Sequence, residues 1–418
     1  QWGAMRWTPR SRLLEARLAA QPGVRSIRRP ITPGAARQFD LHYVRTGPPS
    51  PHPVLVIPGG PGIASIQTYR AMRKHASALG LDIVMMEHRG VGMSRHDDDG
   101  HDLPTAAITI DQVVDDLSAV LDDIGAERAV VYGSSYGTYL AAGLAVRHPG
   151  RIHAMVLDSP VLSARDIDEI RSAVRGLLLD GRRTGSADVA EKVRRLVSGG
   201  AFDSLSGEVA ATAYAIGGLP LLSRLLDLLL SGHTLLWRGM AQLGTLTLRN
   251  IPYHHEVDLV GRIAFRELDY AGQPDGLPLD PSEALLKVAD QIPGPTPSFE
   301  GEPYDLVAEM PGFDWPTVVV SGRRDLTTPP AVAARVAELV PDAVLVEFQT
   351  AAHSILDTRE AAALQIMRSV VDGQSGDLAL RAGELDDLPG NASVRLLVAF
   401  IELAAAVEKR VPGTSPIV

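Results

Sequence analysis

Short apolar runs alternate with amphipathic stretches along the first 160 residues of the chain. Continuous apolar runs of about four to eight residues are typical of buried strands in a parallel sheet. Four such runs predict strands: 54–57, 82–86, 128–132 and 153–157. The stretch 109–124 repeats its apolar residues at helical spacing and ends before Gly125, which predicts a helix. Because strands and helices alternate, we expect an α/β protein with a mostly parallel sheet and helices on both faces.

Two earlier strands are expected within 25–46, separated by a Pro-Gly turn. The alternation stops at residue 161, and 161–312 is rich in helical Leu, Ala and Arg patterns without a clear buried strand. It resumes with strands expected at 318–320 and 343–348, each followed by a helix. This order predicts an α/β domain that is interrupted after its sixth strand by a large helical cap.

The chain is therefore expected to divide into a core, an insertion and two terminal segments. These are an α/β core at 25–160 and 313–372, a helical cap at 161–312, a helical extension at 373–418 and a basic arm at 1–24. Gln1 to Ala4 resemble a tag remnant before Met5. The extension is expected to hold two helices, 377–388 and 391–410, and the sequence leaves their role open.

Composition excludes several classes of function. Of the 418 residues, 45% are hydrophobic and 22% charged, which are globular proportions. There is no cysteine, so disulfides, thiolate metal sites and a cysteine nucleophile are excluded. The net charge of −10 argues against a nucleic-acid partner. Residues 1–37 nevertheless hold eight arginines and one acid, and we expect this basic segment to fold over an acidic body.

No apolar stretch reaches the roughly 20 residues of a transmembrane helix, and none resembles a secretory signal. We therefore expect a cytoplasmic protein without a membrane partner. His96 and His101 flank an acidic loop, which we expect to be solvated rather than a cation site. The histidines form no metal-binding pair of the HExxH type, and no metal is expected.

The predicted strand 128–132 runs into Gly133-Ser134-Ser135-Tyr136-Gly137, and a helix follows at once. This is the G-x-S-x-G pattern in its strand–turn–helix context, where the central serine projects its hydroxyl beyond the sheet. A side chain at either glycine would collide with neighbouring backbone in so sharp a turn. Ser135 is therefore the candidate nucleophile, and Ser134 is expected to be buried or structural.

A serine hydroxyl needs a base to take its proton. His353 fits best, because a short loop separates it from the strand 343–348 and places it at the carboxyl edge of the sheet. Asp325 follows the strand 318–320 and is the candidate carboxylate that orients this histidine. The chain order Ser135, Asp325, His353 is the order expected of an α/β hydrolase.

Backbone N–H groups are needed to stabilise the oxyanion that forms on the substrate. We expect one from Tyr136, next to the nucleophile, and one from Gly60 in the glycine-rich loop 58–62. Neither Gly-Lys-Ser/Thr nor G-x-G-x-x-G occurs at this position, so neither a phosphate loop nor a dinucleotide site is expected. The sequence thus predicts no cofactor.

Four segments resemble the proline iminopeptidase and tripeptidyl aminopeptidase family of α/β-hydrolase serine peptidases. They are PGGPG at 58–62, EHRGVGMS at 87–94, GSSYGTYLA at 133–141, and SGRRDLTTP at 321–329 with AAHS at 351–354. The resemblance implies the α/β-hydrolase fold. Proline iminopeptidases usually have a histidine where this chain has Pro58, so a side-chain role at that position is lost. The cysteines of many secreted relatives are also absent, which favours an intracellular protein.

In that family, acidic residues of the cap bind the free α-amine of the peptide. The resemblance therefore implies carboxylates in the cap that pair with an ammonium group and reject a blocked N-terminus. Glu267 and Asp269 are the best local candidates, because they lie among apolar and aromatic residues. The alternative is that they are ordinary acids on a helix surface.

Three interpretations of the function remain open. The first is a serine hydrolase that cleaves small or N-terminal amide bonds through an acyl-enzyme, as an aminopeptidase of the proline iminopeptidase type does. The second is an esterase, lactonase or thioesterase acting on an acyl or secondary-metabolite substrate, because the Leu-rich stretch 219–236 would suit an apolar cap. The third is a non-catalytic scaffold that binds a ligand. The expected partner is a small molecule or short peptide, and a homo-oligomer is left open.

Overall fold

The computed structural model describes residues 9–247, 250–290, 292, 294–295, 297–410 and 413. Eight strands form one sheet: β1 (Val24–Pro30), β2 (Gln38–Thr46), β3 (Val54–Ile57), β4 (Ile83–Met86), β5 (Ala129–Ser134), β6 (Ile152–Asp158), β7 (Thr317–Gly322) and β8 (Val344–Phe348). Their order across the sheet is β1-β2-β4-β3-β5-β6-β7-β8. β2 is antiparallel to both neighbours, and the strands from β4 to β8 pair in parallel. The fold class predicted from the sequence is confirmed.

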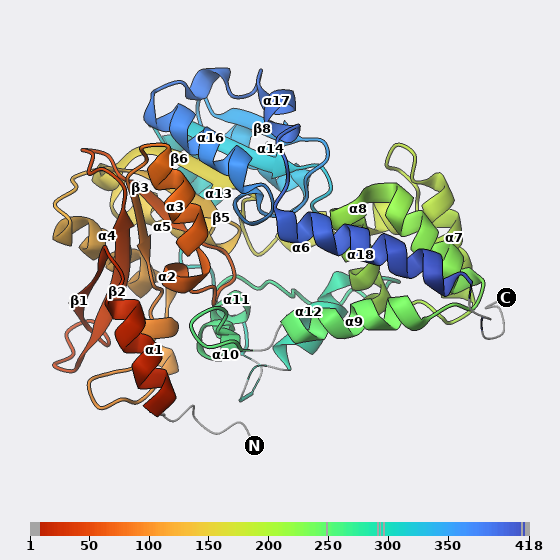
Figure 1. The fold of residues 1–418 in the computed structure, drawn as a ribbon, viewed down its shortest axis with the longest axis horizontal. Helices are drawn as coiled ribbons and strands as arrows, with labels where there is room; N and C mark the ends of the chain where they lie inside the picture. Colours follow the sequence, from red (N-terminus) through yellow and green to blue (C-terminus); the bar gives the residue numbers. More distant parts are fainter. Residues whose placement is uncertain are drawn as a thin grey trace.

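The central strands are buried on both faces, which is why they appear in the sequence as continuous apolar runs. In β3, Leu55 and Ile57 join the core on one face, and Val54 and Val56 join the core on the other. The first face is covered by α4 (Ile110–Asp123), α5 (Tyr136–Arg147) and α14 (Pro330–Leu339). The second is covered by α3 (Arg70–Ala78) and α16 (Glu360–Val371), with α1 (Pro9–Ala19) at one edge. Figure 1 shows this layered part of the molecule on the left.

Two short helices follow strand-to-helix turns at the same edge of the sheet. They are α2 (Ser65–Thr68), in the segment after β3, and α15 (Ile355–Thr358), in the segment after β8. The sequence predicted a single helix after the strand 343–348, but the backbone leaves helical geometry at Arg359, with φ −135° and ψ 51°. The result is a separate short helix directly after the loop that carries His353.

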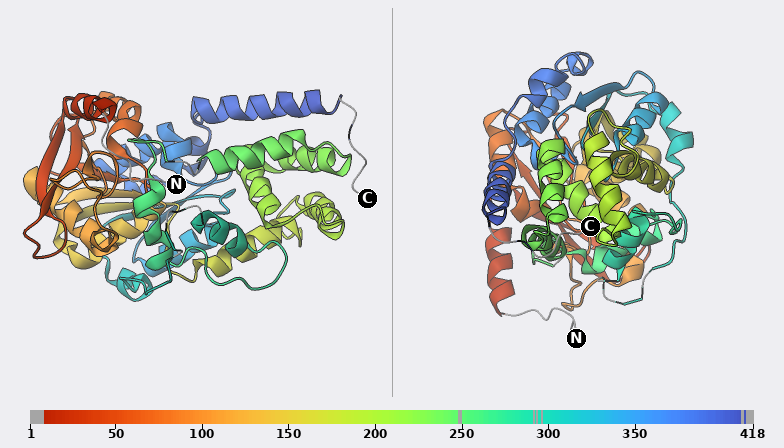
Figure 2. Two further views of the ribbon diagram at one scale, coloured as in Figure 1. Left: turned by 90° about the horizontal axis from the view of Figure 1, so that it is seen from below. Right: turned by 90° about the vertical axis from the view of Figure 1, so that its right-hand side faces the viewer.

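The insertion builds a helical cap with a core of its own. Its helices are α6 (Asp166–Leu178), α7 (Ala187–Ser198), α8 (Ser204–Leu230), α9 (Leu235–Thr247) and α12 (Pro281–Ala289). Leucines of α8 are the centre of this core, and α7 and α9 pack against them. Figure 2 shows the cap helices extending away from the sheet.

The sequence analysis took the whole insertion 161–312 as a cap, but only part of it forms the cap. Its second half returns to the sheet through α10 (Val257–Val260), α11 (Arg262–Arg266) and α13 (Leu306–Glu309). Val260, Ile263 and Leu306 belong to the same apolar cluster as α4 and α5. Helical periodicity shows which face of a segment is apolar but not which core that face joins, so the sequence could not separate these helices from the cap.

The C-terminal extension is divided between the two parts of the molecule. α17 (Ala382–Asp386) is shorter than the predicted helix 377–388 and packs on the sheet side, where Leu385 is buried. α18 (Ala392–Glu408) instead lies along the cap beside α8 and α9, as Figures 1 and 2 show. Ile401 and Ala405 are buried in the cap core. α18 therefore completes the cap, one of the roles that the sequence had left open.

Arginines near the N-terminus pair with the acidic loop at residues 97–99. Arg28 donates two hydrogen bonds to Asp98, at 2.8 and 2.6 Å, and a third to Asp40 at 3.0 Å. Arg37 is bonded to Asp97 and, at 3.4 Å, to Asp99. This is the arrangement expected of a basic segment folded over an acidic body.

Among the described residues, one helix is long and apolar enough to cross a membrane, namely α8. Half of its most apolar window is buried within the protein. The helix is also kinked at Gly218, where φ is 67° and ψ −165°, and Pro220 follows the kink. A kinked helix buried in this way is typical of the core helix of a cap.

Candidate active site

Ser135 lies in the sharp turn between β5 and α5, with φ 53° and ψ −122°. Only glycine fits two positions before it and two positions after it. A Cβ at Gly133 would lie 2.3 Å from the carbonyl oxygen of Gly137, and a Cβ at Gly137 would lie 2.1 Å from that of Ile57. The positive φ of a non-glycine residue is a strain that the surrounding structure must hold in place. The turn thus presents the Ser135 hydroxyl beyond the end of the strand.

Three side chains predicted from separate parts of the sequence meet here. The Ser135 Oγ and the His353 Nε2 are 2.9 Å apart, and the His353 Nδ1 and the Asp325 Oδ2 are also 2.9 Å apart. They come from the ends of β5, β8 and β7, which lie within one half of the sheet. A nucleophile bonded to a base that is itself bonded to a carboxylate is the geometry of an activated serine.

Asp325 is held rigidly. Its side chain is buried, and it accepts hydrogen bonds from the backbone N–H groups of Thr327 at 2.8 Å and Thr328 at 2.9 Å. The Thr328 hydroxyl donates a further bond to Oδ2 at 2.9 Å. The sequence analysis did not single out Thr328. Its signal was an Asp followed by Thr two and three residues later, which is typical of a carboxylate that bonds its own turn.

The charge of Asp325 controls the basicity of His353. Burial of the ring lowers the pKa of His353, but the negative charge of Asp325 and its hydrogen bond outweigh burial, so the pKa is raised above its ordinary value. A raised pKa means that the imidazolium formed during the reaction is stabilised.

Buried polar groups anchor the segment after His353. Ser354 has a left-handed backbone, with φ 59° and ψ 97°, and its N–H donates to the Ser159 hydroxyl at 2.9 Å. The Ser354 hydroxyl lies 2.8 Å from that of Ser134, which is fully buried. Asp158 then accepts the N–H groups of Ile355 and Leu356, the first residues of α15. This network fixes the position from which His353 reaches Ser135.

The glycine-rich loop 58–62 lies against the nucleophile. A Cβ at Gly59 would be 3.0 Å from the Cβ of Ser135, so Gly59 permits the close approach of the loop. Gly60 is the exposed residue of the loop, with φ 113°, and its N–H makes no hydrogen bond within the described part of the chain. Tyr136 is the first residue of α5, where a backbone N–H has no acceptor in its own helix. Both N–H groups suit the oxyanion role, which stays a prediction.

Comparison with known proteins shows what the part of the chain around this site is similar to. The family model described as the α/β hydrolase fold matches residues 52–198. A probable proline iminopeptidase from Streptomyces coelicolor is 27% identical over 137 residues, which are 33% of this chain and 41% of that protein. A proline iminopeptidase from Heyndrickxia coagulans is 27% identical over 175 residues, which are 41% of this chain and 54% of that protein.

The chain has the α/β-hydrolase fold. A crystal structure of proline iminopeptidase from Mycobacterium smegmatis is 16% identical, covers 92% of this chain and 99% of its own, and has a TM-score of 0.45. The resemblance to proline iminopeptidases rests on the two sequence matches and is confirmed at their level of 27% identity. The matched stretches span about two fifths to half of these two relatives, so the activity and substrate of the chain remain proposals.

The EHRG motif at residues 87–90 supports the site from within the core. The Glu87 carboxylate accepts the N–H groups of Ser65 and Ile66 at 2.7 and 3.1 Å, which fixes the start of α2. His88 Nε2 lies 3.1 Å from the Tyr136 hydroxyl. Burial lowers the pKa of His88 to about 4, so its ring is neutral. Its Nδ1 donates to the Arg89 carbonyl oxygen at 2.6 Å, which leaves Nε2 to accept the bond from Tyr136. The motif therefore holds the residue that follows the nucleophile.

The two cap acids chosen from the sequence have different surroundings. Glu267 is buried, is paired with Arg266 and accepts the N–H of Ile110 at 2.9 Å. Its charge is already compensated, so the structure favours a structural role for Glu267. Asp269 is half-buried, and burial raises its pKa. The sequence could not distinguish them, because the partner of Glu267 on α4 is 157 positions away along the chain.

Within the described part of the chain, one group of side chains has a geometry that could hold a cation. Asp97, Asp99 and His101 present their ligand atoms within 4.8 Å of one another, but Asp99 and His101 are exposed. The Arg37 guanidinium already bonds to both carboxylates. The Arg37 guanidinium thus already supplies these carboxylates with the positive charge that a metal ion would supply.

Proposed function

We propose that the chain is a serine hydrolase that removes N-terminal residues from short peptides through an acyl-enzyme. The observation that carries this proposal is the hydrogen-bonded series Ser135, His353 and Asp325 at the carboxyl edge of the sheet. The similarity to proline iminopeptidases supports an amide bond as the target.

In the proposed reaction, the Ser135 Oγ attacks the carbonyl carbon while His353 Nε2 takes the hydroxyl proton. Asp325 stabilises the resulting imidazolium, and the N–H groups of Gly60 and Tyr136 stabilise the oxyanion. The C–N bond then breaks, and His353 gives its proton to the leaving nitrogen. The acyl group stays on Ser135 as an ester. Water attacks this ester with His353 as base, which releases the acid and restores the serine.

Carboxylates near the start of the cap support a free-amine requirement. Burial, together with a smaller contribution from the charge of Glu302, raises the pKa of Asp166 to about 7. Burial likewise raises the pKa of Glu302, and the charge of Asp269 adds to this shift. An ammonium group placed among these three acids would relieve their repulsion and restore their ionised forms. Asp166 accepts the N–H of Leu162 at 2.7 Å and Glu302 accepts that of Ala164 at 3.0 Å, so both carboxylates lie against the same loop. We therefore extend the predicted amine site from Asp269 to Asp166 and Glu302.

The loop that precedes Asp166 lies close to the nucleophile. The N–H of Val161 donates to the Thr138 hydroxyl at 2.9 Å, and Thr138 is in the first turn of α5. The Tyr270 hydroxyl is buried without a hydrogen-bond partner among the described residues. Burial and, to a smaller extent, the negative charge of Asp166 raise its pKa. An acceptor or donor on the substrate could satisfy this hydroxyl.

The Leu-rich stretch that suggested an acyl substrate does not support that alternative. Its buried leucines, among them Leu221, Leu225 and Leu229, belong to the core of the cap. They are apolar because they hold the cap together, which removes the reason for preferring an ester or lactone. The non-catalytic alternative is also disfavoured, because all three members of the series are present and bonded.

The test compares three chromogenic substrates with wild type and Ser135→Ala. The substrates are a prolyl or alanyl arylamide with a free amine, its N-acetylated form and a short-chain nitrophenyl ester. We expect cleavage of the free-amine amide, little cleavage of the acetylated form, and a loss of about 10⁴- to 10⁶-fold in kcat for Ser135→Ala. Cleavage of the ester alone would reject the peptidase. Unchanged turnover by a folded Ser135→Ala variant would reject the serine mechanism.

A further inference from the structure

A cavity of about 400 Å³ opens beside His353. Its walls come from three distant parts of the chain: α8, the segment from the end of β8 to α16, and the start of α18. α18 thus supplies part of a cavity that touches the general base, although it follows the hydrolase core in sequence.

The proposed reaction indicates what this cavity would hold. In the acyl-transfer step the Ser135 Oγ–carbon bond forms, the carbon–nitrogen bond breaks, and the proton of His353 passes to the leaving nitrogen. The leaving nitrogen must therefore lie within hydrogen-bond reach of His353. Because His353 forms part of the cavity wall, the rest of the leaving group has this space beside it.

The lining suits an apolar side chain. Ile216, Ala351, Ala352, Val394 and Val398 contribute aliphatic groups to the wall. A volume of about 400 Å³ is at the lower end of the roughly 300–1,000 Å³ typical of pockets for small molecules. A single amino-acid residue fits within such a space.

Two arginines line the cavity, and they differ in their partners. Arg359 donates to the carbonyl oxygens of Asp386 and Leu388 and, at 2.7 Å, to the Thr350 hydroxyl. Its guanidinium is thus used to hold the loop. Within the described part of the chain, the side chain of Arg395 makes no hydrogen bond or ion pair and is exposed.

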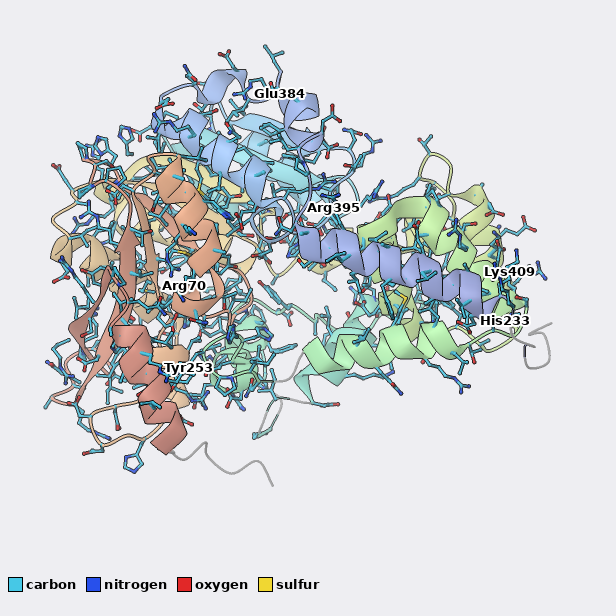
Figure 3. The ribbon with its side chains drawn as sticks, viewed as in Figure 1. Arg70, His233, Tyr253, Glu384, Arg395 and Lys409 are labelled. Atoms are coloured by element: carbon cyan, nitrogen blue, oxygen red, sulfur yellow. The ribbon has the colours of Figure 1, made fainter. Side chains whose placement is uncertain are left out.

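Arg395 lies at the end of α18 that faces the hydrolase core, as Figure 3 shows, and Lys409 lies at the opposite end. Arg395 is in the first turn of the helix, where the helix dipole adds positive potential. A free guanidinium in this position is suited to a carboxylate, which it can bind with two parallel hydrogen bonds.

We propose that the cavity between α8 and α18 binds the leaving group, and that Arg395 recognises its free carboxylate. This inference rests on the proposed function and specifies its substrate: a short peptide in which the residue after the scissile bond is apolar and C-terminal. Arg395 is then a specificity-determining residue that acts on the released amino acid.

The experiment measures kcat/KM for three substrates with the same free N-terminal residue: the dipeptide ending in leucine, its C-terminal amide, and the dipeptide ending in glycine. Wild type is expected to prefer the free acid to the amide by about fivefold, the upper range for an exposed ion pair. It is also expected to prefer leucine to glycine by about tenfold or more, because of the aliphatic wall.

Each variant is judged by a ratio measured within that variant, so a general loss of activity cancels. Arg395→Gln is expected to bring the acid-to-amide ratio close to one, and Arg395→Lys to keep part of the preference. Lys409→Gln is the matched control, because it removes a positive charge from the far end of the same helix and should leave the ratio unchanged. Val394→Trp fills the cavity and should reduce the leucine-to-glycine ratio.

An unchanged acid-to-amide ratio in Arg395→Gln would overturn the assignment of Arg395 while amide cleavage by Ser135 still stood. If amides are not cleaved at all, the peptidase proposal fails by itself. The cavity is then tested with esters whose alcohol is the hydroxy acid analogue of leucine, as free acid and as amide. A preference for the free acid that depends on Arg395 would keep the cavity assignment, and its absence would reject it.

Discussion

Asp325 decides the charge state of His353 at the scale of single residues. Asp325→Asn preserves shape but removes the negative charge that holds the pKa of His353 above its ordinary value. Neutral His353 is the active base, so activity in wild type should be lost as pH falls through this raised pKa. In Asp325→Asn the pKa should fall, the acid limb of kcat/KM should move to lower pH, and kcat should drop by about 10³- to 10⁴-fold.

The measurement is the pH profile of kcat/KM with the substrate that wild type cleaves best. Asp372→Asn is a suitable control, because that carboxylate forms a surface ion pair with Arg368 and is not one of the groups that the structure places around His353. An acid limb at the same pH in wild type and Asp325→Asn would show that another group limits activity.

The segment between β8 and α16 acts as one unit at the scale of elements, and Asp158 is its anchor. Its carboxylate accepts the N–H groups of Ile355 and Leu356 and the hydroxyl of Tyr132. In Asp158→Asn at least one of these donors loses its acceptor, which costs about 1–3 kcal/mol of the free energy of unfolding. A shift of α15 would displace His353, and a displacement of about 1 Å can lower kcat by up to ~10²-fold.

Thermal unfolding and kcat of Asp158→Asn would be measured beside Tyr132→Phe. The second variant removes one hydroxyl donor and leaves both backbone bonds of α15 in place, so its loss of kcat should be much smaller. Equal losses in the two variants would indicate that the buried tyrosine, rather than the helix anchor, controls the position of His353.

The sequence predicted those elements whose signals are local. The eight strands, the turn at Ser135 and the order of the three candidate residues follow from short apolar runs and adjacent turn residues. Long-range partners carry no such signal. Glu267 pairs with the start of α4, and α10 and α11 join the core of the sheet, because folding brings together segments that are far apart along the chain. The sequence did not identify Arg395 for the same reason, because nothing in it indicates that a helix after the core returns to the site.

At the scale of the whole molecule, the cap is assembled from two segments that the hydrolase core separates. α18 inserts Ile401 and Ala405 into the core of the cap, and Glu408 accepts the N–H groups of Leu235 and Leu236 at the start of α9. The opposite face of α18 is exposed, with Leu403 65% accessible against 3% for Ile401. The last helix of the chain therefore stabilises the cap as well as lining the cavity beside His353.

Two substitutions two residues apart test this arrangement. Ile401→Ala should leave a cavity in the core of the cap and lower the free energy of unfolding by about 2–4 kcal/mol. Leu403→Ala removes a similar side chain from the exposed face and should change it by less than about 0.5 kcal/mol. Calorimetry should show the loss in the transition of the cap, because the two clusters around the sheet contain no residue of α18. Equal effects of the two variants would mean that α18 does not pack on the cap as the structure has it, and the cavity beside His353 would then lack its third wall.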